Sequence, residues 1–187
     1  MTLLRKYHKY VGPSQFGAIL GLDEFQSCDD LRDEIENGYI PISNTKTQYG
    51  NDYESIALYY YQKIHHVTIE HPKFAVDPHN PRIGGICDGL LDVRTGIEVK
   101  CHTKESNLLQ SIHPRYLVQL AGYLYLYQRD KWILISNIFN SNQTLKKCQT
   151  FEVTWDQVKS QWEQEWYPKI VEFVTSVKWA KDSSNKI

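Results

Sequence analysis

The chain has 187 residues, of which 41% are hydrophobic and 13% aromatic, so it can bury a substantial core and is not a disordered chain. Its formal net charge of −1 excludes a global cationic field, so any contact with nucleic acid has to use local basic patches. The sequence has no run of about eighteen apolar residues and no secretory leader, and its 4 cysteines contain no Cys-x-x-Cys pair. We therefore expect an intracellular protein with free thiols, no membrane span and no zinc ribbon.

Two short helices are predicted near the N-terminus. The first begins with Ser14 as its N-cap and ends near Gly21. The second begins near Ser27 and stops at Gly38, a residue type that favours the left-handed conformation after a helix.

A longer helix is predicted from about residue 50 to 65, with Glu54, Ala57, Leu58 and Tyr61 on one stripe. A carboxylate therefore lies in line with the apolar face. Because burial of an unpaired carboxylate is costly, we expect Glu54 to have a cation, a metal ion or a shifted pKa. The alternative is a glutamate in the first helical turn, at the rim of the core.

A hairpin follows, with strands at 90–93 and 97–101 and a turn at 94–96. Glu98 and Lys100 share one face of the second strand, and Asp88 precedes the first strand. A Glu-x-Lys pair alone is also typical of a solvated sheet surface. With Asp88 added, two carboxylates and a lysine converge, and Asp92 is a second candidate opposite Glu98.

The C-terminal half alternates helices and strands. A helix begins at Pro114 and carries Gln119, a lone amide that either packs between helices or orients a catalytic group. Strands are predicted at 132–139 and 151–154, and the aromatic helix at 155–179 is assigned to the core. The chain is thus predicted to form one mixed α/β (α+β) domain over residues 1–187. It has a helical segment at about 1–45 and a frayed tail at about 181–187.

Five motifs carry a family resemblance. They are a serine-led first helix (Gly12 to Gly21), an aromatic-Gly-x-x-x-Glu-x-x-Ala helix (Tyr49 to Ala57), an Asp-Gly motif (Cys87 to Leu90), a Glu-x-Lys strand (Gly96 to Cys101) and a Tyr-x-x-Gln helix (Tyr116 to Tyr123). In this order and spacing the chain resembles the phage-lambda-type exonucleases, or YqaJ-like viral recombinases. These belong to the restriction-endonuclease-like PD-(D/E)xK nucleases, which have a central mixed β-sheet flanked by helices.

The resemblance implies a metal-dependent active site formed by Glu54, Asp88, Glu98, Lys100 and Gln119. Mg²⁺ or Mn²⁺ prefers oxygen ligands, which Asp88, Glu98, the Val99 carbonyl and Glu54 supply. Lys100 would act on the attacking water and on the charge developing at phosphorus, and Gln119 would fix Lys100.

The resemblance also implies contacts with DNA. The residues assigned to them are Ser14, Arg5, Lys9, Tyr123 and Lys104. Two positions depart from the family pattern. Ile86-Cys87 replaces the frequent Ser-Pro before the aspartate, and Tyr7 stands in the register of a phosphate-binding arginine, for which Arg5, Lys6 and Lys9 are the candidate substitutes.

The implied function is a Mg²⁺-dependent deoxyribonuclease that degrades duplex DNA ends, with 5′-to-3′ polarity, for viral or phage recombination inside the host cell. A single-strand annealing protein and a homotrimer are the implied partners. Two alternatives are a structure-specific or restriction-type endonuclease and a non-catalytic nucleic-acid-binding module.

Overall fold

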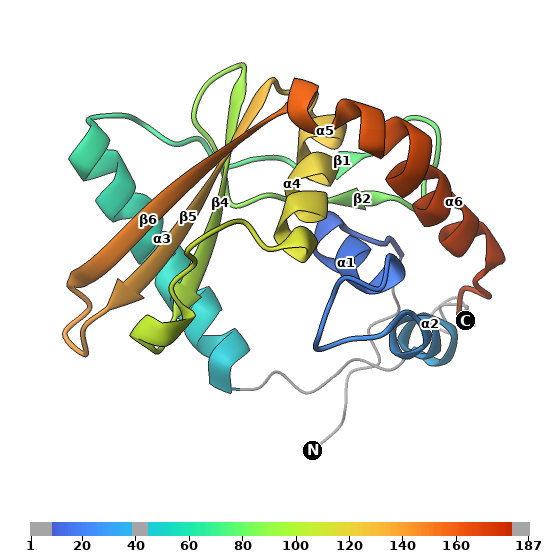
Figure 1. Ribbon diagram of the computed structural model, residues 1–187, viewed down its shortest axis with the longest axis horizontal. Coiled ribbons are helices and arrows are strands. Elements are labelled where there is room, and N and C mark those ends of the chain that lie inside the picture. The colour runs from blue at the N-terminus through green and yellow to red at the C-terminus, as the bar shows by residue number, and fades with distance from the viewer. Residues whose placement is uncertain (1–8, 39–44, 181–187) are drawn as a thin grey trace, which may run out of the picture.

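Among the described residues, a four-stranded mixed sheet forms the centre of the protein (Figure 1). The computed structural model describes residues 9–38 and 45–180. The helical elements are the 3-10 turn η1 (Pro13–Gln15), α1 (Phe16–Ile19), α2 (Cys28–Asn37), α3 (Thr45–His65), the 3-10 turn η2 (Glu105–Asn107), α4 (Pro114–Tyr127), α5 (Trp155–Gln161), the π-helical turn η3 (Trp162–Trp166) and α6 (Tyr167–Ser176). The strands are β1 (Ala75–Val76), β2 (Gly84–Gly85), β3 (Gly89–Leu90), β4 (Thr95–His102), β5 (Lys131–Phe139) and β6 (Leu145–Thr154).

The strand order in the central sheet is β3-β4-β5-β6. β4 and β5 run parallel, which requires a crossover, and α4 lies in that crossover. The two outer pairs are antiparallel, and β1 and β2 form a separate antiparallel pair. The expected fold class, a mixed central sheet flanked by helices, is confirmed.

Helices cover both faces of the sheet and create two hydrophobic clusters (Figure 1). Ile97 and Val99 of β4 pack with the predicted apolar stripe of α3 on one face. Trp132 and Leu134 of β5 pack with α4 and the C-terminal helices on the other. Because both faces are buried, β5 is an almost continuous apolar run rather than an alternating one.

The turn of the active-site hairpin lies earlier than the sequence predicted. Gly89 pairs with Ile97 and Leu90 with Gly96, so the turn occupies 91–94 and Gly96 already belongs to β4. A Cβ on Gly96 would clash with the indole ring of Trp132. Gly96 therefore serves close packing within a strand and not the chain reversal that its residue type suggested.

Helix limits followed the sequence where the capping residues were strong. Ser27 accepts a hydrogen bond from the Asp30 amide at the start of α2, and Gly38 ends α2 with φ +67°, both as predicted. The first helical segment starts at Pro13 with Gly12 as N-cap, so the assignment of this cap to Ser14 is wrong. α3 also begins earlier than expected, at Thr45.

The predicted C-terminal aromatic helix is one helical stretch interrupted by the π turn η3. Pro168 lies in the first turn of α6. Proline has no N–H, and its ring crowds the carbonyl four residues earlier, so the widened turn just before it accommodates the missing hydrogen bond. The aromatic side chains Trp162 and Trp166 are buried as expected.

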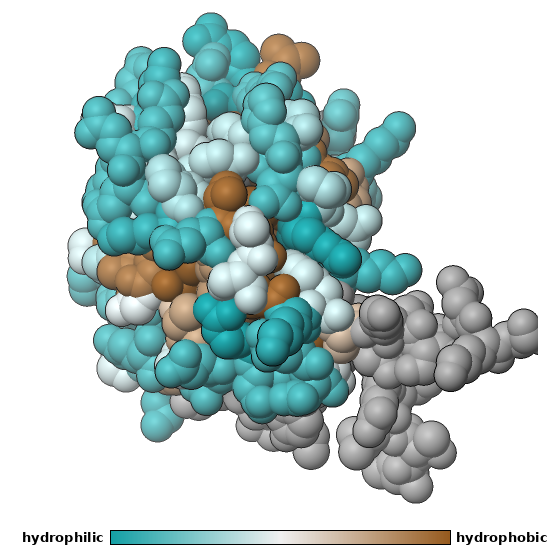
Figure 2. Space-filling model, turned by 90° about the vertical axis from the view of Figure 1, so that its right-hand side faces the viewer, coloured by the Kyte–Doolittle hydropathy of each residue, from teal (hydrophilic) through white to brown (hydrophobic). Residues whose placement is uncertain are grey.

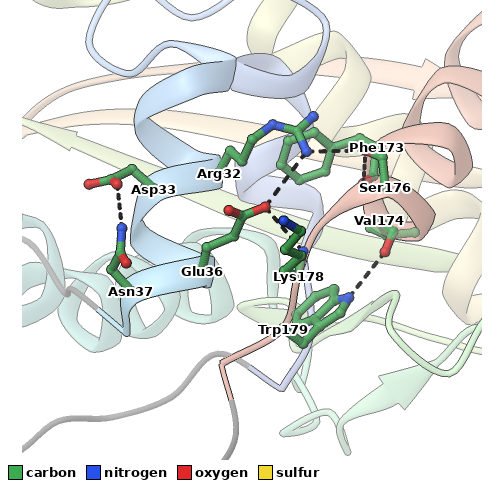
Figure 3. Close-up of polar contacts among 9 residues, drawn as sticks. All are labelled: Arg32, Asp33, Glu36, Asn37, Phe173, Val174, Ser176, Lys178 and Trp179. Carbon is green, nitrogen blue, oxygen red and sulfur yellow. Dashed lines mark hydrogen bonds and ion pairs between the residues drawn. The ribbon is translucent and has the colours of Figure 1, made fainter.

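The segment after α6 is attached to α2 (Figure 3). The guanidinium of Arg32 lies 5.0 Å from the Phe173 ring centroid and donates to Ser176 Oγ at 3.2 Å. Glu36 accepts a hydrogen bond from the Lys178 amide at 3.1 Å.

On the face that carries α2 and α6, hydrophilic side chains dominate and hydrophobic ones form small separate areas (Figure 2).

Two further expectations concern membrane crossing and thiols. No helix within residues 9–38 and 45–180 has the length and apolar character needed to cross a membrane. Cys28, Cys87, Cys101 and Cys148 are all free, as expected.

Candidate active site

The register of the β3–β4 hairpin brings the two principal carboxylates together. The β3–β4 ladder ends at the pair Gly89–Ile97, and Asp88 and Glu98 are the next residues beyond this pair on the two chain segments. The backbone N–H of Val99 donates to Asp88 Oδ2 at 2.6 Å, which fixes this carboxylate at the edge of β4. The predicted convergence of Asp88 and Glu98 therefore follows from strand pairing.

Glu98 is the centre of the polar cluster. It is 3% exposed, and its Oε1 accepts hydrogen bonds from Lys100 Nζ and Gln119 Nε2, each at 2.6 Å. Gln119 therefore holds Glu98 directly, although the family resemblance predicts that it fixes Lys100. The second oxygen, Glu98 Oε2, is buried and has no hydrogen-bond partner among the described residues.

Burial and the nearby charge of Glu98 raise the pKa of two carboxylic acids, Asp88 and Glu54. Burial raises the pKa of Asp88 well above its ordinary value, and the negative charge of Glu98 adds to this, while Lys100 opposes it. The pKa of Glu54, half-buried on α3, is raised by burial and then by Glu98. Glu54 therefore lies within electrostatic reach of the pair.

Lys100 is held in its charged form despite its environment. Burial favours the neutral amine, but the charges of Glu98 and Asp88 and the hydrogen bond to Glu98 outweigh it and raise the Lys100 pKa. The ammonium also lies 5.3 Å from the ring centroid of Tyr116 on α4. The contact between Tyr116 and Lys100 was not predicted; the one signal for it in the sequence is that Tyr116 lies three residues before Gln119 on the same helix.

The donor set fits a hard divalent cation. Within residues 9–38 and 45–180, no three His, Cys, Asp or Glu side chains form a metal-binding group. Mg²⁺, however, is commonly held by one or two carboxylates together with waters and substrate oxygens. The buried, unpartnered Oε2 of Glu98 and the repulsion felt by Asp88 are both features that a cation would relieve.

A backbone oxygen completes this donor set. In an extended strand, the N–H and C=O of one residue point to the same edge. Since the Val99 N–H faces Asp88, the Val99 carbonyl points to that edge too. The β3–β4 ladder pairs β4 only as far as Ile97, so β3 does not cover this edge at Val99.

Asp92, the second candidate ligand, lies elsewhere. It is exposed in the hairpin turn, and its carboxylate accepts the Arg94 backbone N–H at 2.7 Å, which lowers its pKa. The turn at 91–94 removes Asp92 from the ladder, so it does not lie opposite Glu98. The expected position of Asp92 opposite Glu98 is therefore wrong, and its role as a rival ligand stays a prediction.

The residues predicted to bind substrate divide into three groups. Tyr123 is 5% exposed, stacks on Trp132 and donates to the Ile86 carbonyl, so it supports the segment before Asp88, and its assignment to substrate contact stays a prediction. Ser14, Lys9 and Lys104 have exposed side chains. Arg5, with Lys6 and Tyr7, lies outside the described residues.

The fold is shared by solved nuclease structures. The chain is similar to an alkaline exonuclease (LHK-Exo) from Laribacter hongkongensis, with a TM-score of 0.67 and 19% identity, covering 90% of this chain and 89% of that one. A second structure of LHK-Exo is described in complex with dAMP; it gives a TM-score of 0.65 at 18% identity, with 90% and 89% coverage. A phage-related exonuclease from Haemophilus somnus 129PT gives 0.65 at 19% identity, with 90% and 92% coverage.

These likenesses define the fold as that of phage-type exonucleases. The family is shown by sequence. The model of the YqaJ-like viral recombinase domain matches residues 4–129, and the chain belongs to this family. No curated protein matches the chain.

Proposed function

We propose that this protein is a metal-dependent DNA exonuclease that hydrolyses phosphodiester bonds at duplex ends. The observation that carries the proposal is the buried Glu98, which has one oxygen held by Lys100 and Gln119 and the other without a hydrogen-bond partner in the described part of the chain. The family membership supports a role in viral or phage recombination. The fold neighbours described as exonucleases support the reaction, and the dAMP in one of them belongs to the product class that stepwise cleavage releases.

Asp88, Glu98 and the Val99 carbonyl are the proposed ligands of Mg²⁺ or Mn²⁺, and Glu54 is an outer carboxylate of the same site. The cation, when bound, supplies positive charge that polarises a phosphate oxygen and favours an ionised water. Asp88 and Glu98 hold their oxygens at neighbouring positions of one hairpin, which limits the reorganisation that binding requires.

Lys100 is the proposed catalytic cation. Its ammonium donates to Glu98 Oε1, and it has further N–H donors for the attacking water and for a phosphoryl oxygen. Because the lysine remains charged, it stabilises the negative charge that develops on the phosphoryl oxygens. Gln119 is a positioning residue, since it acts on Glu98 and, through the shared oxygen, on Lys100.

The finer assignments are part of the same proposal. We assign 5′-to-3′ polarity, Mg²⁺ dependence, a homotrimer that encloses DNA, and a single-strand annealing protein as partner. The net charge of −1 supports a ring that encloses DNA. Because the chain has no net positive charge, attraction to a broad cationic surface would not hold DNA during repeated cleavage. We also propose that the protein acts inside a host cell during phage or viral DNA processing.

One experiment separates the proposal from its alternatives. Linear duplex DNA, labelled at either the 5′ or the 3′ end, and covalently closed circles of the same sequence are incubated with Mg²⁺ or with a chelator. Release of mononucleotides from linear DNA only, with Mg²⁺ only, is expected, and the label released first gives the polarity. Cleavage of circles at the linear rate would favour an endonuclease, and binding without cleavage would favour a non-catalytic module.

A further inference from the structure

The loop between α1 and α2 presents an exposed aromatic ring. Phe25 is 77% exposed, although phenylalanine is normally a core residue. The backbone N–H of Phe25 donates to Asp23 Oδ1 at 2.8 Å, so the side chain of Asp23 stabilises the turn that carries the ring.

The loop is attached to the first turn of α4. The Arg115 guanidinium lies 4.8 Å from the Phe25 ring centroid and 3.5 Å from Asp23 Oδ1. His113 Nε2 lies 3.7 Å from Glu24 Oε1. Three successive loop residues are therefore held by Arg115 of α4 and by His113, the N-cap of α4, and one face of the Phe25 ring is occupied by a cation.

Both ends of the loop are also anchored. Gly17 of α1 lies against Arg115, where a Cβ on the glycine would approach the arginine Cβ to 3.0 Å. α2 is attached to the end of α6 by the contacts of Arg32 and Glu36 (Figure 3). The position of Phe25 is thus fixed relative to the sheet.

A chain of aromatic and cationic contacts connects Phe25 to the catalytic lysine. Arg115 donates to the Tyr116 hydroxyl at 2.8 Å, and its guanidinium lies 4.6 Å from the Tyr116 ring centroid. The Tyr116 ring also lies near Lys100, whose ammonium is 5.3 Å from the ring centroid, and it meets the His113 ring edge-on at 6.4 Å. Only Arg115 and Tyr116 separate the exposed ring from the group proposed to act on the scissile phosphate.

We propose that Phe25 is a stacking platform for a nucleobase of the strand whose phosphate is held at Lys100. This inference rests on the proposed nuclease function. A base offers a flat π-face whatever its sequence, and aromatic stacking is the sequence-tolerant way to hold single-stranded nucleotides. Arg115 supports the ring from the face that the base does not use.

Other exposed aromatic rings of the described chain lack this combination. Phe74, which is 47% exposed, contacts Tyr10 with the ring centroids 4.8 Å apart and the ring planes tilted by 52°. Tyr59 lies on α3 and contacts Lys63. Within the part of the chain that the structure describes, neither ring contacts Lys100, Tyr116 or Arg115, so Phe74 is a matched control for Phe25.

The test compares the wild type with Phe25→Ala, Phe25→Trp and Phe74→Ala. A 2-aminopurine placed in turn at each of the first nucleotides of a linear duplex reports stacking by loss of its fluorescence. The protein is first treated with a chelator to remove bound metal ions. DNA binding is then measured with added Ca²⁺, and DNA cleavage with added Mg²⁺. Circular dichroism and thermal unfolding check that each variant is folded.

We expect the wild type and Phe25→Trp to quench one position, and Phe25→Ala to lose this quenching. Phe25→Ala should also raise KM for DNA by about tenfold, with the effect on kcat smaller than that on KM, while Phe74→Ala matches the wild type. If the wild type degrades DNA and Phe25→Ala keeps the same quenching and the same KM, this inference alone would be overturned. A wild type that neither binds nor degrades DNA would remove the proposed function instead.

Discussion

Gln119 on α4 and Lys100 on β4 donate hydrogen bonds to the same oxygen of Glu98, each at 2.6 Å. This shared acceptor joins the helix of the crossover to the strand that carries the reactive groups. Because Oε1 already accepts two hydrogen bonds, Oε2 is the oxygen of Glu98 that can bind a further partner. The geometry thus assigns one oxygen to orientation and leaves the other for a cation.

Replacing Gln119 by leucine removes this orientation while keeping the volume of the side chain close to that of glutamine. We expect activity and Mn²⁺ affinity each to fall about 10- to 100-fold, as for other groups that orient metal ligands. Isothermal calorimetry with Mn²⁺ and a nuclease assay measure the two effects. If affinity were unchanged while activity fell, Gln119 would act on the substrate rather than on Glu98.

Lys100→Ala is expected to lower kcat on linear duplex DNA by at least about 100-fold, because the ammonium that stabilises developing charge is lost. DNA binding in Ca²⁺ should be largely retained. Lys131→Ala is the control, since Lys131 pairs with Glu152 at 3.2 Å in a partly exposed ion pair. Near-wild-type turnover in a clean preparation of Lys100→Ala would remove the catalytic assignment.

The carboxylates can be separated by calorimetry. Asp88→Ala and Glu98→Ala should each abolish measurable Mn²⁺ binding, because each removes an anionic oxygen ligand from one site. Asp92→Ala should bind Mn²⁺ like the wild type, since Asp92 is exposed in the turn and bonded to Arg94. The reverse pattern would place the cation at the hairpin turn.

Gly96→Ala tests the packing that the sequence did not reveal. The added methyl group would clash with Trp132, and overpacking of this kind costs about 1–3 kcal/mol. Urea denaturation measures the loss. Gly21→Ala is a comparison for backbone strain without overpacking: its φ of +68° costs a residue with a Cβ about 1–2 kcal/mol, and the space around that Cβ is open.

Local patterns predicted most of the fold and part of the site. The α2 caps, the apolar stripe of α3, Pro114 at the start of α4 and the apolar run of β5 are short-range signals, and each element formed there. Asp88, Glu98 and Lys100 were found because strand alternation and motif spacing place them together. The bond from Gln119 to Glu98 was not, because it depends on how α4 crosses the sheet.

The same limit explains the errors. Glycine is typical of turns, and aspartate is typical of both turns and metal sites. Only the pairing of Gly89 with Ile97 shows that Gly96 lies in a strand and Asp92 in the turn. Tyr123 lies on the face of α4 that also carries Gln119, but packing against Trp132 buries it. Long-range contacts of this kind leave no periodic signal in one sequence.

The last prediction concerns stability in the metal-free protein. Burial and the charge of Glu98 raise the pKa of Asp88 above its ordinary value of 3.8. The folded state therefore binds the proton more tightly than the unfolded state does. The favourable contribution is complete below the unfolded pKa and is lost as the pH rises through the folded pKa.

Asp88→Asn removes this titration and keeps an oxygen that accepts the Val99 N–H. At pH 7 without metal, we expect the variant to have a higher Tm than the wild type, and the difference should shrink toward pH 4. Adding Mg²⁺ or Mn²⁺ should raise the Tm of the wild type but not that of the variant, because only the wild type binds the cation when folded. Thermal unfolding by circular dichroism at both pH values, with and without metal, measures all of these differences. A lower Tm for Asp88→Asn in metal-free buffer at pH 7 would mean that the buried Asp88 carboxylate is compensated by Lys100 without a cation.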